Sequence, residues 1–294
     1  MSTIEIARKF LQPLIQKQSL TNELIVIGVS GPQGSGKTYL SSHLRERLQQ
    51  LFPQLHCVDI SIDDFYLSFE DQLKLAIENP TNWLVSGRGP PGTHDIELMN
   101  DTMSKLRKKL PNISIPRYNK SAHEGRGDRA PISEWVHIGA KPVDVVILEG
   151  WFTGYTAIET SEDLANMWSN IKSEKSPKFD KIRLQDIEFI NSKLKEYQET
   201  WKLFDAFVYI TTDSIDNVYH WRQQQEHALI QSKGTGMTDE EVQLFVDRYM
   251  PSYYLYYDKL AEKGCGSTKH NCRIKIDLAR QVISFRGLNQ GALL

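Results

Sequence analysis

The feature that most constrains this chain is a glycine-rich segment that directly follows an apolar run. The run covers residues 24–29, and the segment reads Gly31-Pro32-Gln33-Gly34-Ser35-Gly36-Lys37-Thr38. This order matches the pattern G-x-x-x-x-G-K-[ST], in which a strand leads into a loop and a helix follows. Leucines recur near one face of the expected helix, at Leu40, Leu44, Leu48 and Leu51. The segment therefore predicts a strand, a phosphate-binding loop and a helix, in that order.

The residue types of this loop suit a nucleoside triphosphate and Mg²⁺. Its glycines, Gly31, Gly34 and Gly36, allow the tight turns that point backbone N–H groups at phosphate oxygens. Lys37 would place a cation at the β- and γ-phosphates, and the Thr38 hydroxyl could join a Mg²⁺ shell. A glycine-rich turn that binds nothing is the alternative. A strand, a loop and a helix in the required order favour phosphate binding.

The bulk composition bounds the class of protein. With 294 residues, 40% of them hydrophobic and 24% charged, the chain is long enough for one large α/β domain with insertions. A formal net charge of −2 argues against a nucleic acid or a membrane surface held by overall charge. We therefore expect neither nucleic acid nor membrane among the partners. The sequence leaves the oligomeric state open.

The cysteines and the N-terminus indicate the compartment. Cys57, Cys265 and Cys272 are odd in number and lack zinc-type spacing, which favours free thiols in a reducing environment. The N-terminal residues show no pattern of a signal or transit peptide, and no apolar run approaches the length of a membrane span. These features predict a cytoplasmic location, with the nucleus as an alternative.

Short apolar runs alternate with helical patterns along the chain. The runs cover residues 24–29, 57–60, 143–148, 206–210 and 273–276. Such alternation predicts βαβ units around a parallel sheet, and therefore a three-layer α/β/α domain. We expect an N-terminal helix, within residues 1–20, to pack on a single domain over 21–294. Insertions are expected at about 61–142 and 155–205.

Both insertions and the C-terminal part carry helix signals. Helices are expected at 69–78 and 95–110, and again after a polar, lysine-rich stretch at 160–182. Thr238 opens a capping box for a helix that ends or kinks near Pro251. The tyrosines from Tyr249 to Tyr257 would suit base stacking or plain packing, and their helical spacing favours packing.

Acidic residues follow two of the apolar runs. Glu149 ends the run 143–148, and Asp63 and Asp64 follow the run 57–60. Because ligands bind at the carboxyl ends of parallel strands, these acids are expected near the phosphates. Glu149 is a candidate for Mg²⁺, directly or through water, and Asp63 for the base that accepts a hydroxyl proton. The alternative interpretations are a strand-end acid without a function for Glu149, and a turn or a helix cap for Asp63 and Asp64.

Two polar loops offer candidates for binding a phosphate acceptor. The first carries Arg88, His94 and Asp95 around a rigid Gly-Pro-Pro-Gly turn. The second, residues 116–129, carries Arg117, Tyr118, Lys120, Arg126 and Arg129. Guanidinium groups match carboxylates, so these cations could hold an anionic substrate, and a solvated basic loop is the alternative. Further along, Trp221-Arg222 opens a helix, and Arg222 fits a lid cation that closes on the phosphates.

Together these motifs resemble the kinase family that includes uridine kinase, phosphoribulokinase and bacterial pantothenate kinase. Ser61-x-Asp63-Asp64-Phe65-Tyr66 is similar to its segment with the catalytic Asp, and Glu149-Gly150 to its Mg²⁺-associated Glu-Gly. A closer resemblance is to the D-glycerate 3-kinases of plants, over about residues 25–257. Its blocks include Arg88-Gly89, His94-Asp95, Pro116-Arg117-Tyr118-Asn119-Lys120-Ser121-Ala122, Gly125-Arg126-Gly127-Asp128-Arg129-Ala130, Glu149-Gly150-Trp151-Phe152-x-Gly154 and Trp221-Arg222.

The resemblance implies a P-loop kinase fold with the strand order 57–60, 143–148, 24–29, 206–210, 273–276. It also implies transfer of the ATP γ-phosphate to a hydroxyl of a small metabolite, with D-glycerate as the leading acceptor. In this scheme Lys37 neutralises phosphate charge, Thr38 and Glu149 serve Mg²⁺, Asp63 is the base and Arg222 closes as the lid. The acceptor-side candidates are Asp64, Arg88, His94, Asp95, Arg117, Tyr118, Arg126 and Arg129.

The identity of the acceptor stays open at this point. A nucleoside, a pantothenate-like compound or a sugar are alternatives, as is a non-catalytic ATP-binding accessory protein. Asp63, Glu149 and Arg222 argue against lost catalysis, because a pure switch needs no acceptor base. The lysine-rich stretch 160–182 has no counterpart in the resemblance, and the choice between ATP and GTP is likewise open.

Overall fold

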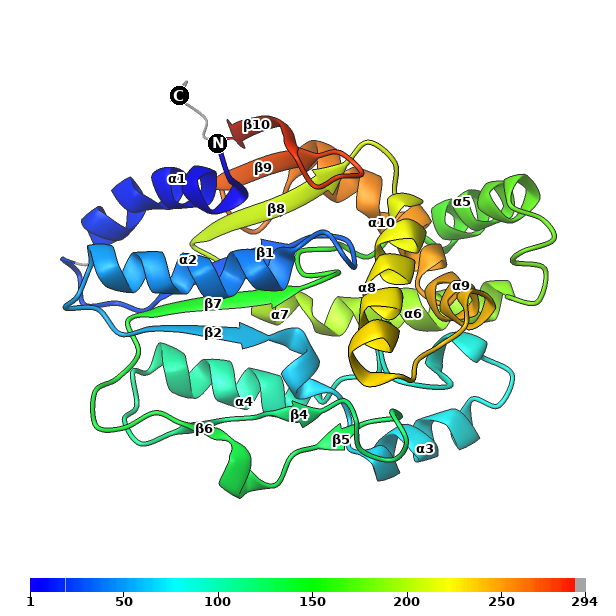
Figure 1. The fold of residues 1–294 in the computed structure, drawn as a ribbon, viewed down its shortest axis with the longest axis horizontal. Helices are drawn as coiled ribbons and strands as arrows, with labels where there is room; N and C mark the ends of the chain where they lie inside the picture. The colour runs from blue at the N-terminus through cyan, green and yellow to red at the C-terminus, as the bar shows by residue number, and fades with distance from the viewer. Residues whose placement is uncertain (19, 289–294) are drawn as a thin grey trace.

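A six-stranded sheet runs through the middle of the part of the chain that the structure describes (Figure 1). The computed structural model describes residues 1–18 and 20–288. The strand order is β10-β9-β8-β1-β7-β2. Five of these strands are parallel: β1 (Ile25–Ser30), β2 (Cys57–Ser61), β7 (Val145–Gly150), β8 (Ala206–Thr212) and β9 (Asn271–Ile276). The α/β fold class and the predicted order of these strands are confirmed.

The sixth strand was not predicted. Strand β10 (Val282–Leu288) pairs antiparallel with β9 at the edge of the sheet. An edge strand is not buried on both faces, so it lacks the continuous apolar run of a central parallel strand. Ile283 and Phe285 are 54% and 45% exposed, and they alternate with polar residues. The sequence signal of β10 is therefore weaker than that of the other strands.

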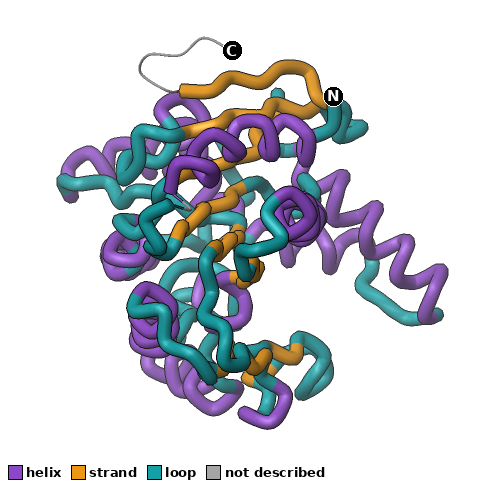
Figure 2. The backbone as a smooth tube through the Cα atoms, turned by 90° about the vertical axis from the view of Figure 1, so that its left-hand side faces the viewer, coloured by secondary structure: helices purple, strands orange, loops and turns teal. Residues whose placement is uncertain are grey.

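The sheet is buried on both faces, which explains its unbroken apolar strands. In β1, Ile25, Ile27 and Val29 belong to the core cluster on one face, and Val26 belongs to the cluster on the other. Successive side chains of a strand point to opposite faces, so both sets must be apolar. Seen edge-on in Figure 2, the strands form a column with helices on either side.

Helices cover both faces of the sheet. Figure 1 shows α1 (Thr3–Gln18) and α2 (Lys37–Leu51) in front of it and α6 (Leu184–Glu196) and α7 (Gln198–Trp201) behind it. The remaining α-helices are α3 (Phe69–Glu78), α4 (Ile96–Arg107), α5 (Ser161–Glu174), α8 (Asn217–Lys233), α9 (Asp239–Asp247) and α10 (Met250–Lys263). In the described residues, no helix combines the length and apolar character needed to cross a membrane.

Short elements in the first insertion carry the two loops that hold the candidate acceptor-binding residues. Strands β3 (Ser114–Ile115) and β6 (Val136–His137) pair with each other, as do β4 (Tyr118–Asn119) and β5 (Asp128–Arg129). Three 3₁₀ helices complete the described elements: η1 (Ile62–Phe65), η2 (Trp83–Val85) and η3 (Ile132–Glu134). The hairpin β4–β5 brings residues 118–129 back toward the end of β2, where η1 begins.

Several local expectations need correction. Leu51 is 43% exposed, because α2 ends there and the face that packs on the sheet is made by Leu40, Leu44 and Leu48. Helix α8 begins at Asn217, one turn before Trp221. Helix α9 ends at Asp247, shortly before Pro251, as expected. Pro251 itself lies in the first turn of α10, where no intrahelical N–H partner is needed.

The lysine-rich stretch and the tyrosine-rich helix also acquire definite structures. Most of residues 160–182 form α5 and its following loop, in which Lys178 pairs with Asp247 at 2.9 Å. Tyr253 and Tyr256 in α10 are almost fully buried, as the packing interpretation predicts. The lysine-rich stretch is therefore tied to the α9 end, beside the pocket described next.

Candidate active site

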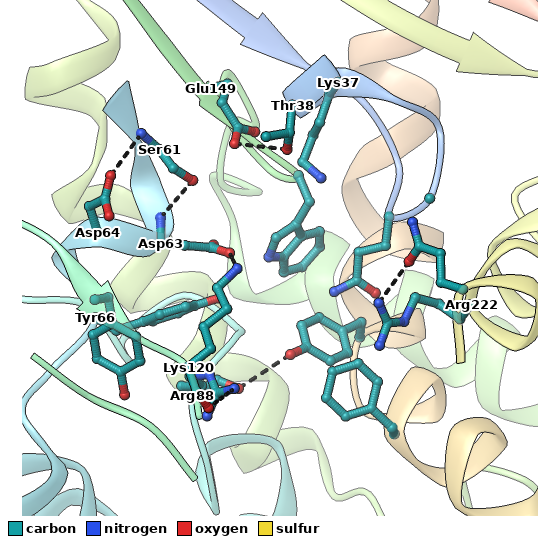
Figure 3. A pocket seen from close by; sticks show the side chains of 17 residues that line it. Lys37, Thr38, Ser61, Asp63, Asp64, Tyr66, Arg88, Lys120, Glu149 and Arg222 are labelled. Carbon is teal, nitrogen blue, oxygen red and sulfur yellow. Dashed lines mark hydrogen bonds and ion pairs between the residues drawn. The ribbon is translucent and has the colours of Figure 1, made fainter. Parts of the chain in front are cut away.

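A pocket of about 390 Å³ opens at the carboxyl ends of β1, β2 and β7 (Figure 3). The lining combines the glycine-rich loop with residues from η1, the β4 hairpin, β7, α8 and the α9–α10 junction. Its lining residues are Gln33, Gly34, Lys37, Thr38, Ser61, Asp63, Asp64, Tyr66, Arg88, Tyr118, Lys120, Glu149, Trp151, Arg222, Gln225, Phe245 and Tyr249. The pocket thus joins the predicted phosphate loop to part of the predicted acceptor side.

The glycine-rich loop has the backbone conformation that phosphate binding requires. Gly34 and Gly36 have φ angles of 81° and 91°, and Gly36 caps the start of α2. A side chain at Gly34 would meet Cβ of Trp221 at 2.3 Å. Both positions therefore need glycine, one for close packing as well as conformation. Helix α2 begins at Lys37, so its free N–H groups lie at the loop.

Thr38 and Glu149 meet beneath this loop. The Thr38 hydroxyl donates to Oε1 of Glu149 at 3.0 Å. The other oxygen, Oε2, is buried and receives no hydrogen bond of regular geometry from the described residues, although the Ser61 side chain interacts with this carboxyl group. Burial raises the pKa of Glu149, and Lys37 only partly opposes it. A buried carboxylate oxygen that receives no such hydrogen bond, beside a hydroxyl, fits a hard divalent cation or its water shell.

The two adjacent aspartates after β2 have different surroundings. Asp64 completes a capping box with Ser61, and its Oδ2 accepts a bond from Nη1 of Arg117 at 2.8 Å. Asp63 instead pairs with Nζ of Lys120 at 2.5 Å (Figure 3). The sequence allowed two interpretations of these acids, a helix cap and an acceptor base. In the structure Asp64 has the geometry of a cap, and Asp63 faces a cation in the pocket.

The electrostatics of the two carboxyl groups also differ. Burial would raise the pKa of Asp63, but Lys120 and, further away, Lys37 outweigh it and hold that pKa below its usual range. For Asp64, burial dominates and raises the pKa despite Arg117. Asp63 is thus the carboxylate that the pocket keeps ionised, the state that a proton acceptor needs.

Of the acceptor-side candidates, Asp64, Arg88 and Tyr118 line the pocket. Arg88 also stabilises the loop around Gly125, because its Nη1 donates to the carbonyl of Gly125 at 2.8 Å and to that of Arg126. The guanidinium lies 5.7 Å from the centre of the Tyr118 ring. Arg88 therefore shapes the loop that carries Lys120 while facing the cavity.

Five other candidates lie outside the described lining of this pocket, and each has a partner. His94 is 4% exposed and bonds to the Tyr197 hydroxyl at 2.8 Å, and burial lowers its pKa to about 3. Arg129 pairs with Asp95 at 2.8 Å. Arg117 pairs with Asp64, as above, and Arg126 lies 4.6 Å from the centre of the Phe69 ring. The structure does not bring these five side chains together in the cavity.

Some features of the lining have little or no signal in the sequence. Lys120 is expected there only as one of the cations that could hold an anionic substrate, and nothing in the sequence indicates that it pairs with Asp63. Tyr66 is another: burial, and next the nearby Asp63 carboxylate, raise its pKa well above the usual range. The adjacency of Tyr66 to the Asp63-Asp64 pair was the only available signal. Phe245 and Tyr249 come from a helix junction far along the chain.

Arg222 and Asp63 lie on opposite sides of the pocket in Figure 3, and Lys37 enters it from the top of the view. Nη1 of Arg222 donates to Oε1 of Gln225 at 2.8 Å, and its guanidinium lies 5.1 Å from the centre of the Phe245 ring. The Nε group is buried and has no partner among the described residues. This geometry holds a cation with an unused donor in the cavity that the glycine-rich loop also lines.

Comparison of the chain with known proteins identifies its family. The model of the phosphoribulokinase/uridine kinase family matches residues 26–168. The probable ATP-dependent kinase TDA10 of Saccharomyces cerevisiae is 38% identical over 89% of this chain and 88% of its own length. The chain belongs to the phosphoribulokinase/uridine kinase family. Members of this family are ATP-dependent small-molecule kinases, and that enzyme class applies to this chain.

Two further relatives of this chain are both named D-glycerate 3-kinase. The chloroplastic D-glycerate 3-kinase of Arabidopsis thaliana is 37% identical over 86% of this chain, which spans 52% of that protein's length. The solved D-glycerate 3-kinase of Cryptococcus neoformans is 31% identical, with a TM-score of 0.88 over 98% of this chain and 99% of the other. These similarities confirm the predicted P-loop kinase family and fold.

For this kinase we predict that Asp95 stabilises the fold rather than binding the acceptor. Asp95 caps α4 by accepting from the Leu98 N–H at 2.8 Å, and it pairs with Arg129. Asp95→Ala should lower the free energy of unfolding by about 1–2 kcal/mol, the cost of a lost helix cap. Urea denaturation measures this change, and the acceptor KM should stay within about twofold of wild type.

The matched control is Asp101→Ala on the same helix. Asp101 forms an exposed pair with Lys105, and such pairs contribute about 0–1 kcal/mol. A large rise in acceptor KM in Asp95→Ala, without loss of stability, would return Asp95 to the acceptor site.

Proposed function

We propose that this kinase transfers the ATP γ-phosphate to a hydroxyl of a small carboxylate-bearing metabolite, with D-glycerate as the leading acceptor. The observation that carries the proposal is the pair of Asp63 and Lys120 in the same pocket as the phosphate loop. A proton acceptor and a cation lie side by side, opposite Lys37 and Arg222. The relatives named D-glycerate 3-kinase support this choice of acceptor.

Five lining residues have proposed roles that their positions support. Lys37 would neutralise charge on the β- and γ-phosphates, and Arg222 would meet the phosphates with its unused donor. Asp63 would accept the proton of the attacking hydroxyl. Thr38 and Glu149 would hold Mg²⁺, which when bound neutralises phosphate charge and helps to orient the transferred group.

The ion pair between Lys120 and Asp63 supports an acceptor with a negative charge. In the structure its Nζ contacts Asp63, the position that an acceptor hydroxyl needs to reach. A hydroxyl that binds at Oδ2 of Asp63 would displace Lys120 from the carboxylate with which it forms its ion pair. A carboxylate on the acceptor would give Lys120 a replacement partner at no loss of charge pairing. A neutral acceptor would leave the cation without one.

The proposal is tested by acceptor-dependent ADP release with Mg-ATP. The panel should contain D-glycerate and other small hydroxy acids, glycerol as the neutral analogue, and nucleosides, sugars and pantothenate. Hydroxy acids should stimulate release, with D-glycerate the strongest. Stimulation by neutral nucleosides or sugars alone would reject the anionic acceptor, and ATP binding without ADP release for any acceptor would favour a non-catalytic accessory protein.

A charge-removing variant examines the role of Lys120 itself. Lys120→Met keeps the aliphatic stem and removes the ammonium group, so acceptor kcat/KM should fall by about 10–100-fold, as for a lost bond to a charged group. The KM for ATP should change little. Lys74→Met, on the exposed face of α3, is the matched control. An unchanged acceptor KM and kcat in Lys120→Met would remove the residue from acceptor binding.

A further inference from the structure

The turn that joins β9 to β10 reaches the phosphate loop from outside the pocket. The Arg280 side chain in this turn donates from Nε to the carbonyl of Gly34 at 2.7 Å. The two residues are 246 positions apart in sequence. A charge-assisted bond to a backbone carbonyl fixes the plane of its peptide group, here the one that follows a glycine with φ of 81°.

The same arginine also holds helix α8. Its Nη1 donates to Oε1 of Gln224 at 3.0 Å, and its guanidinium lies 5.4 Å from the centre of the Trp221 ring. Trp221 is fully buried, and its indole N–H donates to the carbonyl of Leu278 at 2.8 Å. The phosphate loop, α8 and the β9–β10 turn therefore form one interlocked unit.

The backbone of this turn holds Arg280 in an unusual conformation. Its φ angle is 62°, a left-handed conformation that costs free energy for a residue with a side chain. Two backbone bonds within the turn hold it there: Arg280 N–H to the Asp277 carbonyl at 2.9 Å, and Asp277 N–H to the Gln281 carbonyl at 3.0 Å. A residue kept in such a conformation points its side chain in a fixed direction.

We propose that Arg280 is a positioning residue of the nucleotide site. It keeps Gly34 and α8 in register, so the phosphate loop and Arg222 hold their places before the nucleotide arrives. Arg222 follows Trp221 directly, so locking that tryptophan also fixes where Arg222 enters the pocket. Helix α8 then carries Arg222 from a point that is anchored to the phosphate loop.

The expected effect is a selective loss of nucleotide affinity. If the loop of Arg280→Ala adopts its binding conformation about one-tenth of the time, the Kd for Mg-ATP rises about tenfold. Arg280→Lys keeps a charged donor and should restore part of the affinity. The acceptor KM should stay within about twofold of wild type, because the described side-chain contacts of Arg280 are with Gly34, Gln224 and Trp221 and not with Asp63 or Lys120.

The measurement is a calorimetric titration of Mg-ATP without acceptor, so its outcome does not depend on which acceptor the enzyme uses. Arg286→Ala, an exposed arginine on β10, is the matched control and should bind like wild type. Wild-type affinity in Arg280→Ala, or an equal loss in Arg286→Ala, would overturn the proposal. If Arg280→Ala does not fold, unchanged Kd values in both Arg280→Lys and Gln224→Ala would overturn it.

Discussion

Asp63→Asn should lower acceptor-dependent turnover by about 10²–10⁴-fold, the usual contribution of a general base. Asparagine has nearly the same shape but cannot take the hydroxyl proton. The pocket holds the pKa of Asp63 below its usual range, so the wild-type group is ionised and ready to accept. Steady-state kinetics with D-glycerate would measure the loss, and ATP affinity should stay close to wild type. A loose phosphoryl-transfer transition state would place the drop nearer the lower end.

Asp64→Asn is the matched control for this variant. Asp64 caps η1 and pairs with Arg117, so its change should reduce stability as well as rate. Full acceptor-dependent activity in Asp63→Asn would remove Asp63 from the mechanism. An equal loss of ATP affinity would reassign its carboxylate to the metal.

Lys37→Ala should remove most nucleotide binding or turnover while the chain stays folded. Preorganised charge at a reacting group contributes about 10²–10³-fold in rate, and Lys37 lines the pocket together with Glu149 and Arg222. The variant removes this charge from a loop whose glycine conformations and α2 contacts do not depend on the ammonium group. Nucleotide titration and turnover give the effect, and circular dichroism reports the fold.

Arg47→Ala on the exposed side of α2 is the control for Lys37. It removes a cation from the same helix far from the pocket lining, so it should leave both measurements close to wild type. Unchanged ATP affinity together with unchanged turnover in Lys37→Ala would contradict the role of the phosphate loop.

The fold could be predicted largely because its signals are local. The strand before Gly31, the glycine loop and the leucine face of α2 are contiguous in sequence, and the apolar runs mark strands buried on both faces. The strand order came from family resemblance and is confirmed. Strand β10 was missed because it lies at an edge, where Ile283 and Phe285 remain exposed.

The acceptor side could not be predicted as well, because it depends on long-range pairing. Sequence shows cations in the 116–129 loop but not their partners. Folding satisfies Arg117 with Asp64 and Arg129 with Asp95, across 53 and 34 positions, and leaves Lys120 on Asp63. The Arg280 contact with Gly34 spans 246 positions and joins a turn without a motif to the loop with the strongest one.

Transfer of phosphate to a hydroxy acid is best tested by following the phosphate group itself. Phosphorus NMR of the wild-type enzyme with Mg-ATP and D-glycerate should show a new phosphomonoester that grows in step with ADP. Inorganic phosphate as the only other product, or no use of ATP at any glycerate concentration, would contradict the account.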